Sequence, residues 1–163
     1  MKKIISIILI LILSISFSGC KNKNDPSNQI IKCSLDYEPS TLDPQIAEGA
    51  PANTIVTNIF EGLTKIDENN SAIPGVAYKW EANPDFTEYT FYLRENATWS
   101  DESKTLVTAK DFVFALARAI DPATASPNAK TLYCIKNAKD INLKSMPLSS
   151  LGVKELNDHT LSI

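Results

Sequence analysis

Five short motifs follow one another in a fixed order between Glu38 and Pro127, and this order is the most informative property of the chain. They are Ser40-Thr41-Leu42-Asp43-Pro44, Ile59-Phe60-Glu61-Gly62-Leu63, Pro74-Gly75-Val76-Ala77, Leu93-Arg94 and Thr108-Ala109-Lys110-Asp111-Phe112. Thr124-Ala125-Ser126-Pro127 and Leu151-Gly152-Val153-Lys154 extend the series towards the last residue. Proline and glycine are frequent turn residues, so the motifs predict small helices and strands joined by tight turns.

Two stretches have clear periodicity. Tyr89, Phe91 and Leu93 alternate with more polar residues, which predicts a strand with one face on a core. Thr108 precedes Asp111 by three residues, as in a capping box, and apolar residues then recur at helical spacing as far as Ile120. We therefore expect a helix over residues 109–120, ended by the proline at position 122.

Weaker patterns predict the remaining elements, which give a mixed α/β (α+β) fold. A helix is expected over residues 52–60, and strands over residues 30–35, 63–66, 76–80, 153–156 and 160–163, the last two joined as a hairpin. Trp80 and Trp99 are expected in the core, since tryptophans beside an amphipathic strand are most often buried. The final strand stops at Ile163 without a turn or polar tail, so the chain is interpreted as truncated.

The first 19 residues have the pattern of an export signal. Lys2 and Lys3 precede an apolar run over residues 4–17, which as a helix would span only about 21 Å of a roughly 30 Å hydrocarbon core. Small residues then lead to Cys20, the position at which a lipoprotein signal is cleaved and the cysteine lipidated. An ordinary secretory signal cleaved near Gly19 is the alternative, and both place the protein outside the cytoplasm.

A polar stretch over residues 20–29 separates the signal from the folded part and predicts a flexible tether after the lipidated Cys20. Without residues 1–19 the chain loses Lys2 and Lys3 of its 16 basic side chains, so 14 face 19 acidic ones, a formal charge of −5. This acidic balance argues against nucleic-acid binding.

The sequence offers little for catalysis. It has one histidine, no pair of histidines at metal spacing and no glycine-rich phosphate loop, so no catalytic residue, metal or cofactor is predicted. A thiolate of Cys33 or Cys134 activated by His159 is the strongest enzymatic alternative, but His159 falls in a predicted turn where a solvated side chain is expected. Cys33 and Cys134 are read as buried free thiols, with a disulfide left open.

The ordered motifs resemble those of bacterial oligopeptide-binding lipoproteins, the extracellular solute-binding proteins of peptide and nickel ABC importers. The resemblance covers the chain to its last residue and implies the N-terminal portion of a periplasmic-binding-protein-like fold of two lobes. Residues 30–163 would then form a partial solute-binding domain, the start of lobe I plus a small extra domain, and the second lobe would be missing. It implies an oligopeptide ligand, permease subunits of an importer as partners, and a lipid anchor on the outer face of the membrane.

The same resemblance implies site residues. Glu48, Gly49 and Ala50 match the segment that lines the peptide backbone in similar proteins. Glycine admits close backbone approach, although an ordinary loop with Gly49 in a turn explains the pattern equally well. Asn128 stands where similar proteins often have a ligand-facing tyrosine, so it is a weaker candidate.

Other functions stay open at this level. The chain could be a truncated surface lipoprotein without a transport role, or a pseudogene product. Within the same family, nickel, dipeptides, haem or signalling peptides could be the ligand. Thr124 to Pro127 and Leu151 to Lys154 favour oligopeptides.

Overall fold

The computed structural model describes residues 32–163. The predicted signal peptide, Cys20 and the tether lie outside the described residues. The chain divides into two compact units, residues 1–34 and 35–163, and each is considered by itself. Of the first unit only residues 32–34 are described, and they are exposed and without regular structure.

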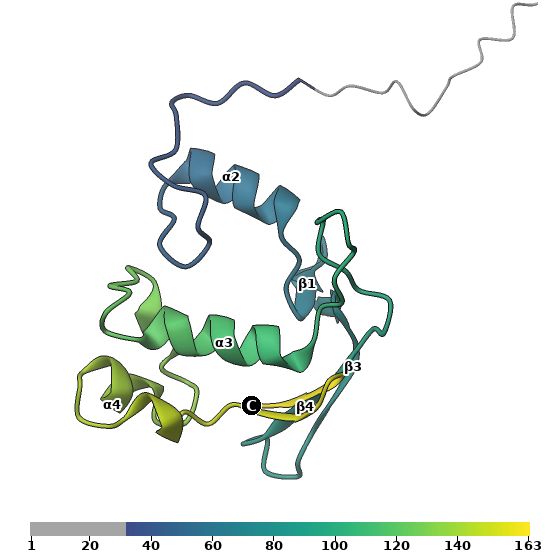
Figure 1. Cartoon of the computed structure of the whole chain (residues 1–163), viewed down its shortest axis with the longest axis vertical. Helices are drawn as coiled ribbons and strands as arrows, with labels where there is room; N and C mark the ends of the chain where they lie inside the picture. Colours follow the sequence, from purple (N-terminus) through teal and green to yellow (C-terminus); the bar gives the residue numbers. More distant parts are fainter. Residues whose placement is uncertain (1–31) are drawn as a thin grey trace, which may run out of the picture. The chain divides into compact units, whose positions relative to one another are not determined.

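The larger sheet of the second unit has four antiparallel strands and lies beside α3 (Ala109–Ile120) (Figure 1). Its strands are β3 (Ala77–Ala82), β4 (Tyr89–Leu93), β6 (Thr160–Ser162) and β5 (Lys154–Asn157), in this spatial order. The alternating stretch predicted around residue 91 is β4, and Phe91 pairs with both Trp80 of β3 and Leu161 of β6. The predicted hairpin near the end of the chain is β5 and β6, and the mixed α/β character is confirmed.

Both edge strands of this sheet carry a β-bulge. In β3 the register shifts between Ala77 and Lys79, so Tyr78 is the extra residue opposite β4. In β5 it shifts between Glu155 and Asn157, so Leu156 is the extra residue opposite β6. A bulge locally re-aims the side chains of its strand.

The helix α3 (Ala109–Ile120) has the predicted bounds and contacts β5 and β6 (Figure 1). The Asp111 carboxylate accepts hydrogen bonds from the Thr108 amide, at 2.7 Å, and from the Thr108 hydroxyl, at 3.1 Å. These bonds satisfy a backbone donor that the helix leaves unpaired, which explains why the helix begins here.

The core lies between α3 and the sheet. Its largest fully buried side chains are Leu93, Ile120, Ile141 and Leu161. Burying a leucine or isoleucine contributes about 1.5 to 3 kcal/mol, so these four residues supply a substantial part of the stability. The α4 helix (Ala138–Asn142) is bonded to the end of α3, because the side-chain amide of Asn142 donates to the Ile120 carbonyl at 2.9 Å.

A further helix, a small hairpin and two 3-10 turns complete the described part of the unit. Helix α2 (Ala50–Ile59) lies near the start of it, and β1 (Thr64–Ile66) pairs with β2 (Ala72–Pro74) in a hairpin of its own. The 3-10 turns η2 (Ala129–Leu132) and η3 (Leu148–Ser150) flank α4. Among the described residues no helix combines the length and the apolar character needed to cross a membrane.

Four predictions are wrong. Residues 32–35 form no strand, because a strand needs a partner and none of the described strands pairs with them; residues 30 and 31 lie outside the described part. Cys33 and Cys134 are free, as expected, but exposed. Trp99 is 43% exposed, while Trp80 is half-buried. His159 is half-buried, because it sits where β6 joins the sheet.

Candidate functional site

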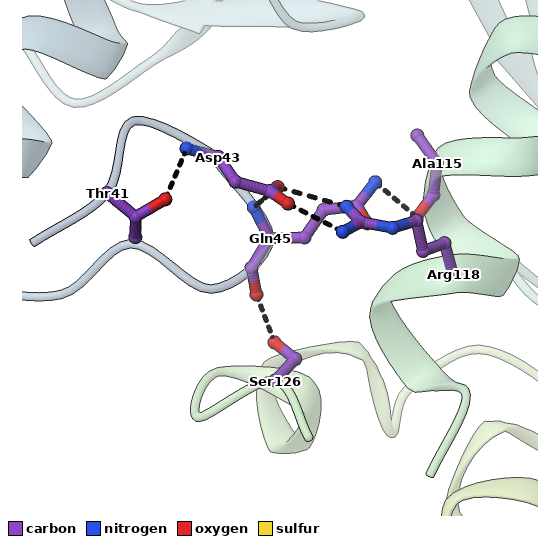
Figure 2. A network of polar contacts seen from close by, with 6 residues as sticks. All are labelled: Thr41, Asp43, Gln45, Ala115, Arg118 and Ser126. Atoms are coloured by element: carbon purple, nitrogen blue, oxygen red, sulfur yellow. Dashed lines mark hydrogen bonds and ion pairs between the residues drawn. The ribbon is translucent and has the colours of Figure 1, made fainter. Parts of the chain in front are cut away.

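A salt bridge holds the loop that precedes α2. The Arg118 guanidinium on α3 donates to both carboxylate oxygens of Asp43, at 3.0 Å from Nη1 to Oδ1 and 2.5 Å from Nη2 to Oδ2 (Figure 2). The two side chains are about one third exposed. A bidentate pair fixes orientation as well as distance, so it sets how the loop lies against α3.

Gln45 reinforces this link from the same loop. Its side-chain oxygen accepts from Arg118 Nη1 at 2.5 Å, and its Nε2 donates to the Ala115 carbonyl at 3.1 Å (Figure 2). Ser126 Oγ donates to the Gln45 carbonyl at 2.6 Å. Loop 41–49, helix α3 and the segment after α3 are therefore joined in one network.

The electrostatics agree with the geometry. The hydrogen bond from Arg118 lowers the pKa of Asp43 below its usual value of 3.8, and the Gln45 amide adds to the effect. The hydrogen bond with Asp43 likewise raises the pKa of Arg118. Asp43 is thus ionised, and the pair intact, over the whole neutral range.

The predicted site residues Glu48, Gly49 and Ala50 follow this network directly, and all three are exposed. Gly49 has φ of 85° and immediately precedes α2. A Cβ atom on Gly49 would lie 2.8 Å from the Tyr37 hydroxyl. The φ angle favours glycine here, since residues with a side chain rarely adopt it. The Tyr37 hydroxyl ends an exposed side chain, which can move aside.

Asn128 is also exposed, and its carbonyl accepts from the Thr131 amide at 3.0 Å as η2 begins. The bond between Ser126 and Gln45 lies two residues before Asn128 and three before Glu48. One hydrogen bond therefore links the chain just before the two predicted segments, which are 78 to 80 residues apart in sequence.

Sequence reasoning missed Gln45 and Arg118, which hold the loop before the site. In the sequence, Arg118 has the pattern of an ordinary polar residue on an amphipathic helix, and Gln45 that of a loop residue. Asp43 belongs to one of the motifs, but its partner Arg118 is 75 residues away. No local pattern in one sequence indicates such a contact.

Among residues 32–163 no group of three His, Cys, Asp or Glu side chains is arranged to hold a metal ion. The exposed site residues carry the Glu48 carboxylate and the side-chain amide of Asn128. Both groups can form hydrogen bonds with a polar ligand.

Comparison with known proteins identifies the class. The family model of bacterial extracellular solute-binding proteins, family 5 (middle), matches residues 71–163, and the chain belongs to this family. The periplasmic oligopeptide-binding protein OppA of Salmonella typhimurium is 48% identical over 128 residues, which are 77% of this chain and 23% of that protein. The chain thus spans about a quarter of the length of such relatives.

Solved structures show the same fold. The murein tripeptide-binding protein MppA of Escherichia coli matches with a TM-score of 0.74 and 39% identity, over 79% of this chain and 25% of that chain. Haemophilus influenzae OppA in complex with the peptide RPPGFSPFR matches with a TM-score of 0.70 and 39% identity, over 77% and 24% of the two chains. The fold predicted from the motifs, part of a periplasmic-binding-protein-like structure, is therefore confirmed.

Proposed function

We propose that this chain forms part of the peptide-binding surface of an extracytoplasmic receptor, which captures oligopeptides for an ABC importer and catalyses no reaction. Membership of a solute-binding family supports the binding role. The peptide-binding relatives, one of them solved with a nonapeptide in place, support the ligand class.

The anchored loop is the observation that carries this proposal. Asp43 and Gln45 are fixed to α3 by Arg118, and the next few residues, Glu48, Gly49 and Ala50, are exposed. A loop held at one end presents its backbone groups in a fixed geometry, which lowers the entropy lost when a ligand binds. Gly49 adds no side chain of its own to this surface, on which a peptide main chain could form hydrogen bonds with the loop.

Recognition of this kind tolerates many peptide sequences. Amides and carbonyls of the ligand main chain are common to all peptides, and bridging waters accommodate different side chains. Asn128, on the other side of the bond between Ser126 and Gln45, would add a side-chain amide to the same surface. A receptor that binds peptides of many sequences needs both main-chain hydrogen bonds and hydrated space for different side chains.

The proposal includes a lipid anchor at Cys20. The apolar run before Cys20, the small residues beside it and the polar stretch after it support lipidation. Two acyl chains hold a protein stably at a membrane, whereas one holds it only marginally. Relatives described as periplasmic support an extracytoplasmic place for the folded part.

A hybrid receptor tests the proposed function. The aligned 128 residues of the Salmonella relative would be replaced by the corresponding residues of this chain, so that the rest of the fold is supplied. Calorimetric titration with tetra-alanine should then give saturable binding. A folded hybrid that binds no tetra-alanine, while the parent receptor binds it, would rule the proposal out.

A further inference from the structure

The four-stranded sheet carries a pocket, separate from the anchored loop. It has a volume of about 620 Å³, and its lining includes Tyr78, Tyr92, Arg94, Asn96, Asn157 and His159. None of the proposed peptide-contacting residues lines it. We propose that this pocket binds a neutral oligosaccharide.

The two β-bulges shape this pocket. Tyr78 is the extra residue of the bulge in β3, and Asn157 directly follows the extra residue of the bulge in β5. Both line the pocket, although they belong to opposite edges of the sheet. A regular strand would alternate the faces of its side chains, so the bulges decide which side chains reach this end of the sheet.

Aromatic rings form one wall. The rings of Tyr78 and Tyr92 lie 6.4 Å apart at an angle of 46°, and Tyr78 is 56% exposed. An exposed tyrosine in a pocket offers an apolar ring together with a polar hydroxyl. The apolar face of a sugar ring can pack on such a surface, while its hydroxyl groups remain available for hydrogen bonds.

The polar groups of the pocket suit a ligand with hydroxyl groups. Asn96 and Asn157 contribute amides, and Thr160 contributes a hydroxyl. Amide and hydroxyl groups both donate and accept hydrogen bonds, as the hydroxyl groups of a sugar require.

The charges around the pocket favour a neutral ligand over an ionic one. Arg94 is paired with Glu61 at 2.6 Å, and Lys79, over the Tyr92 ring, is paired with Glu81 at 2.5 Å. Glu95 also lines the pocket and would repel an anion. Because both cations already have acidic partners, neither sign of charge dominates.

Saturation-transfer NMR on the full chain tests this inference, with maltotetraose, cellotetraose and chitotetraose at up to about 10 mM, a concentration that detects a Kd as weak as about 1 mM. At least one sugar should receive saturation, and Tyr78→Ala should weaken its binding by about tenfold. Phe86→Ala, an exposed aromatic residue outside this pocket, is the matched control and should bind like the unaltered chain.

Asn96→Ala provides a second variant, because Asn96 is exposed and its replacement should leave the fold intact. It should weaken the same sugar even if Tyr78→Ala does not fold. Absence of binding by all three sugars would overturn the proposal, and so would binding that survives the folded Asn96→Ala and Tyr78→Ala variants unchanged.

Discussion

Arg118 binds both carboxylate oxygens of Asp43 across 75 residues of sequence, and this pair fixes the loop that leads to Gly49. Arg118→Ala should free the loop while leaving α3 folded. The Ala47 amide, which donates to the Asp43 carbonyl at 2.8 Å, is a direct reporter. Its hydrogen exchange should accelerate by about tenfold, since local opening controls exchange.

Lys79→Ala is the control for this change. It removes a different salt bridge, with Glu81, in which both side chains are about half exposed. Exposed pairs contribute little, so exchange at Ala47 should not change. Equal exchange in Arg118→Ala and the unaltered chain would show that the pair does not hold the loop.

Acid should release the same loop. The pKa of Asp43 is lowered in the folded state from 3.8, so its ionised form stabilises the fold above that value. This contribution is lost as the pH falls below about 3.8 and through the lower folded-state pKa. In an NMR titration, the Asp43 carboxyl carbon should titrate below 3.8, and Arg118→Ala should move its pKa back up. A pKa unaffected by that substitution would contradict the assigned cause.

Gly49→Ala should destabilise the unit by about 1 to 2 kcal/mol, because alanine is strained at φ of 85° and its Cβ would meet the Tyr37 hydroxyl at 2.8 Å. Urea unfolding measures the loss. Tyr37→Phe removes the hydroxyl and should restore part of the stability when combined with Gly49→Ala. A double variant no more stable than the single one would leave backbone strain as the whole cause.

Asp111→Ala should weaken the start of α3, because the Thr108 amide loses its acceptor at 2.7 Å. Loss of a capping bond costs about 1 kcal/mol, which lowers Tm by roughly 3 °C in a chain of this size. Lys110→Ala, the adjacent residue with a mainly exposed side chain, is the control in the same thermal scan. Equal melting of both variants would refute a stabilising role for the cap.

Cys20→Ser should abolish lipid attachment. Cells given an alkyne analogue of palmitate should label the unaltered chain and the Cys33→Ser variant, and Cys20→Ser should be unlabelled. Label that persists in Cys20→Ser would place the lipid elsewhere, and an unlabelled parent chain would favour an ordinary secretory signal.

The elements predicted correctly are those defined by neighbours in sequence. The capping box at Thr108, the alternation around Phe91 and the hairpin before Ile163 each depend on a few adjacent residues. The strand predicted over residues 30–35 depends on the β-forming Ile30 and Ile31, and residues 32–35, the part that the structure describes, form no strand, because propensity does not supply a pairing partner.

The sequence predicted the site residues but not the groups that hold them in place. The family motifs indicated Glu48, Gly49 and Ala50, but the groups that hold them come from α3 and from Ser126. The prediction of burial was wrong for Trp99 and Cys134. Their apolar character favours burial, but tertiary packing leaves both side chains exposed. The bulges at Tyr78 and Leu156 lie within pairs of consecutive strands, but the alternation of side chains along a strand does not indicate the register shift.

Photo-crosslinking tests the central claim most directly. A tetra-alanine analogue with a diazirine side chain would be irradiated on the hybrid receptor, and modified residues located by mass spectrometry. We expect modification within Glu48 to Ala50, with excess tetra-alanine preventing it. Competable modification confined to other regions of the receptor, with none at Glu48 to Ala50, would contradict the proposal that this loop contacts the peptide.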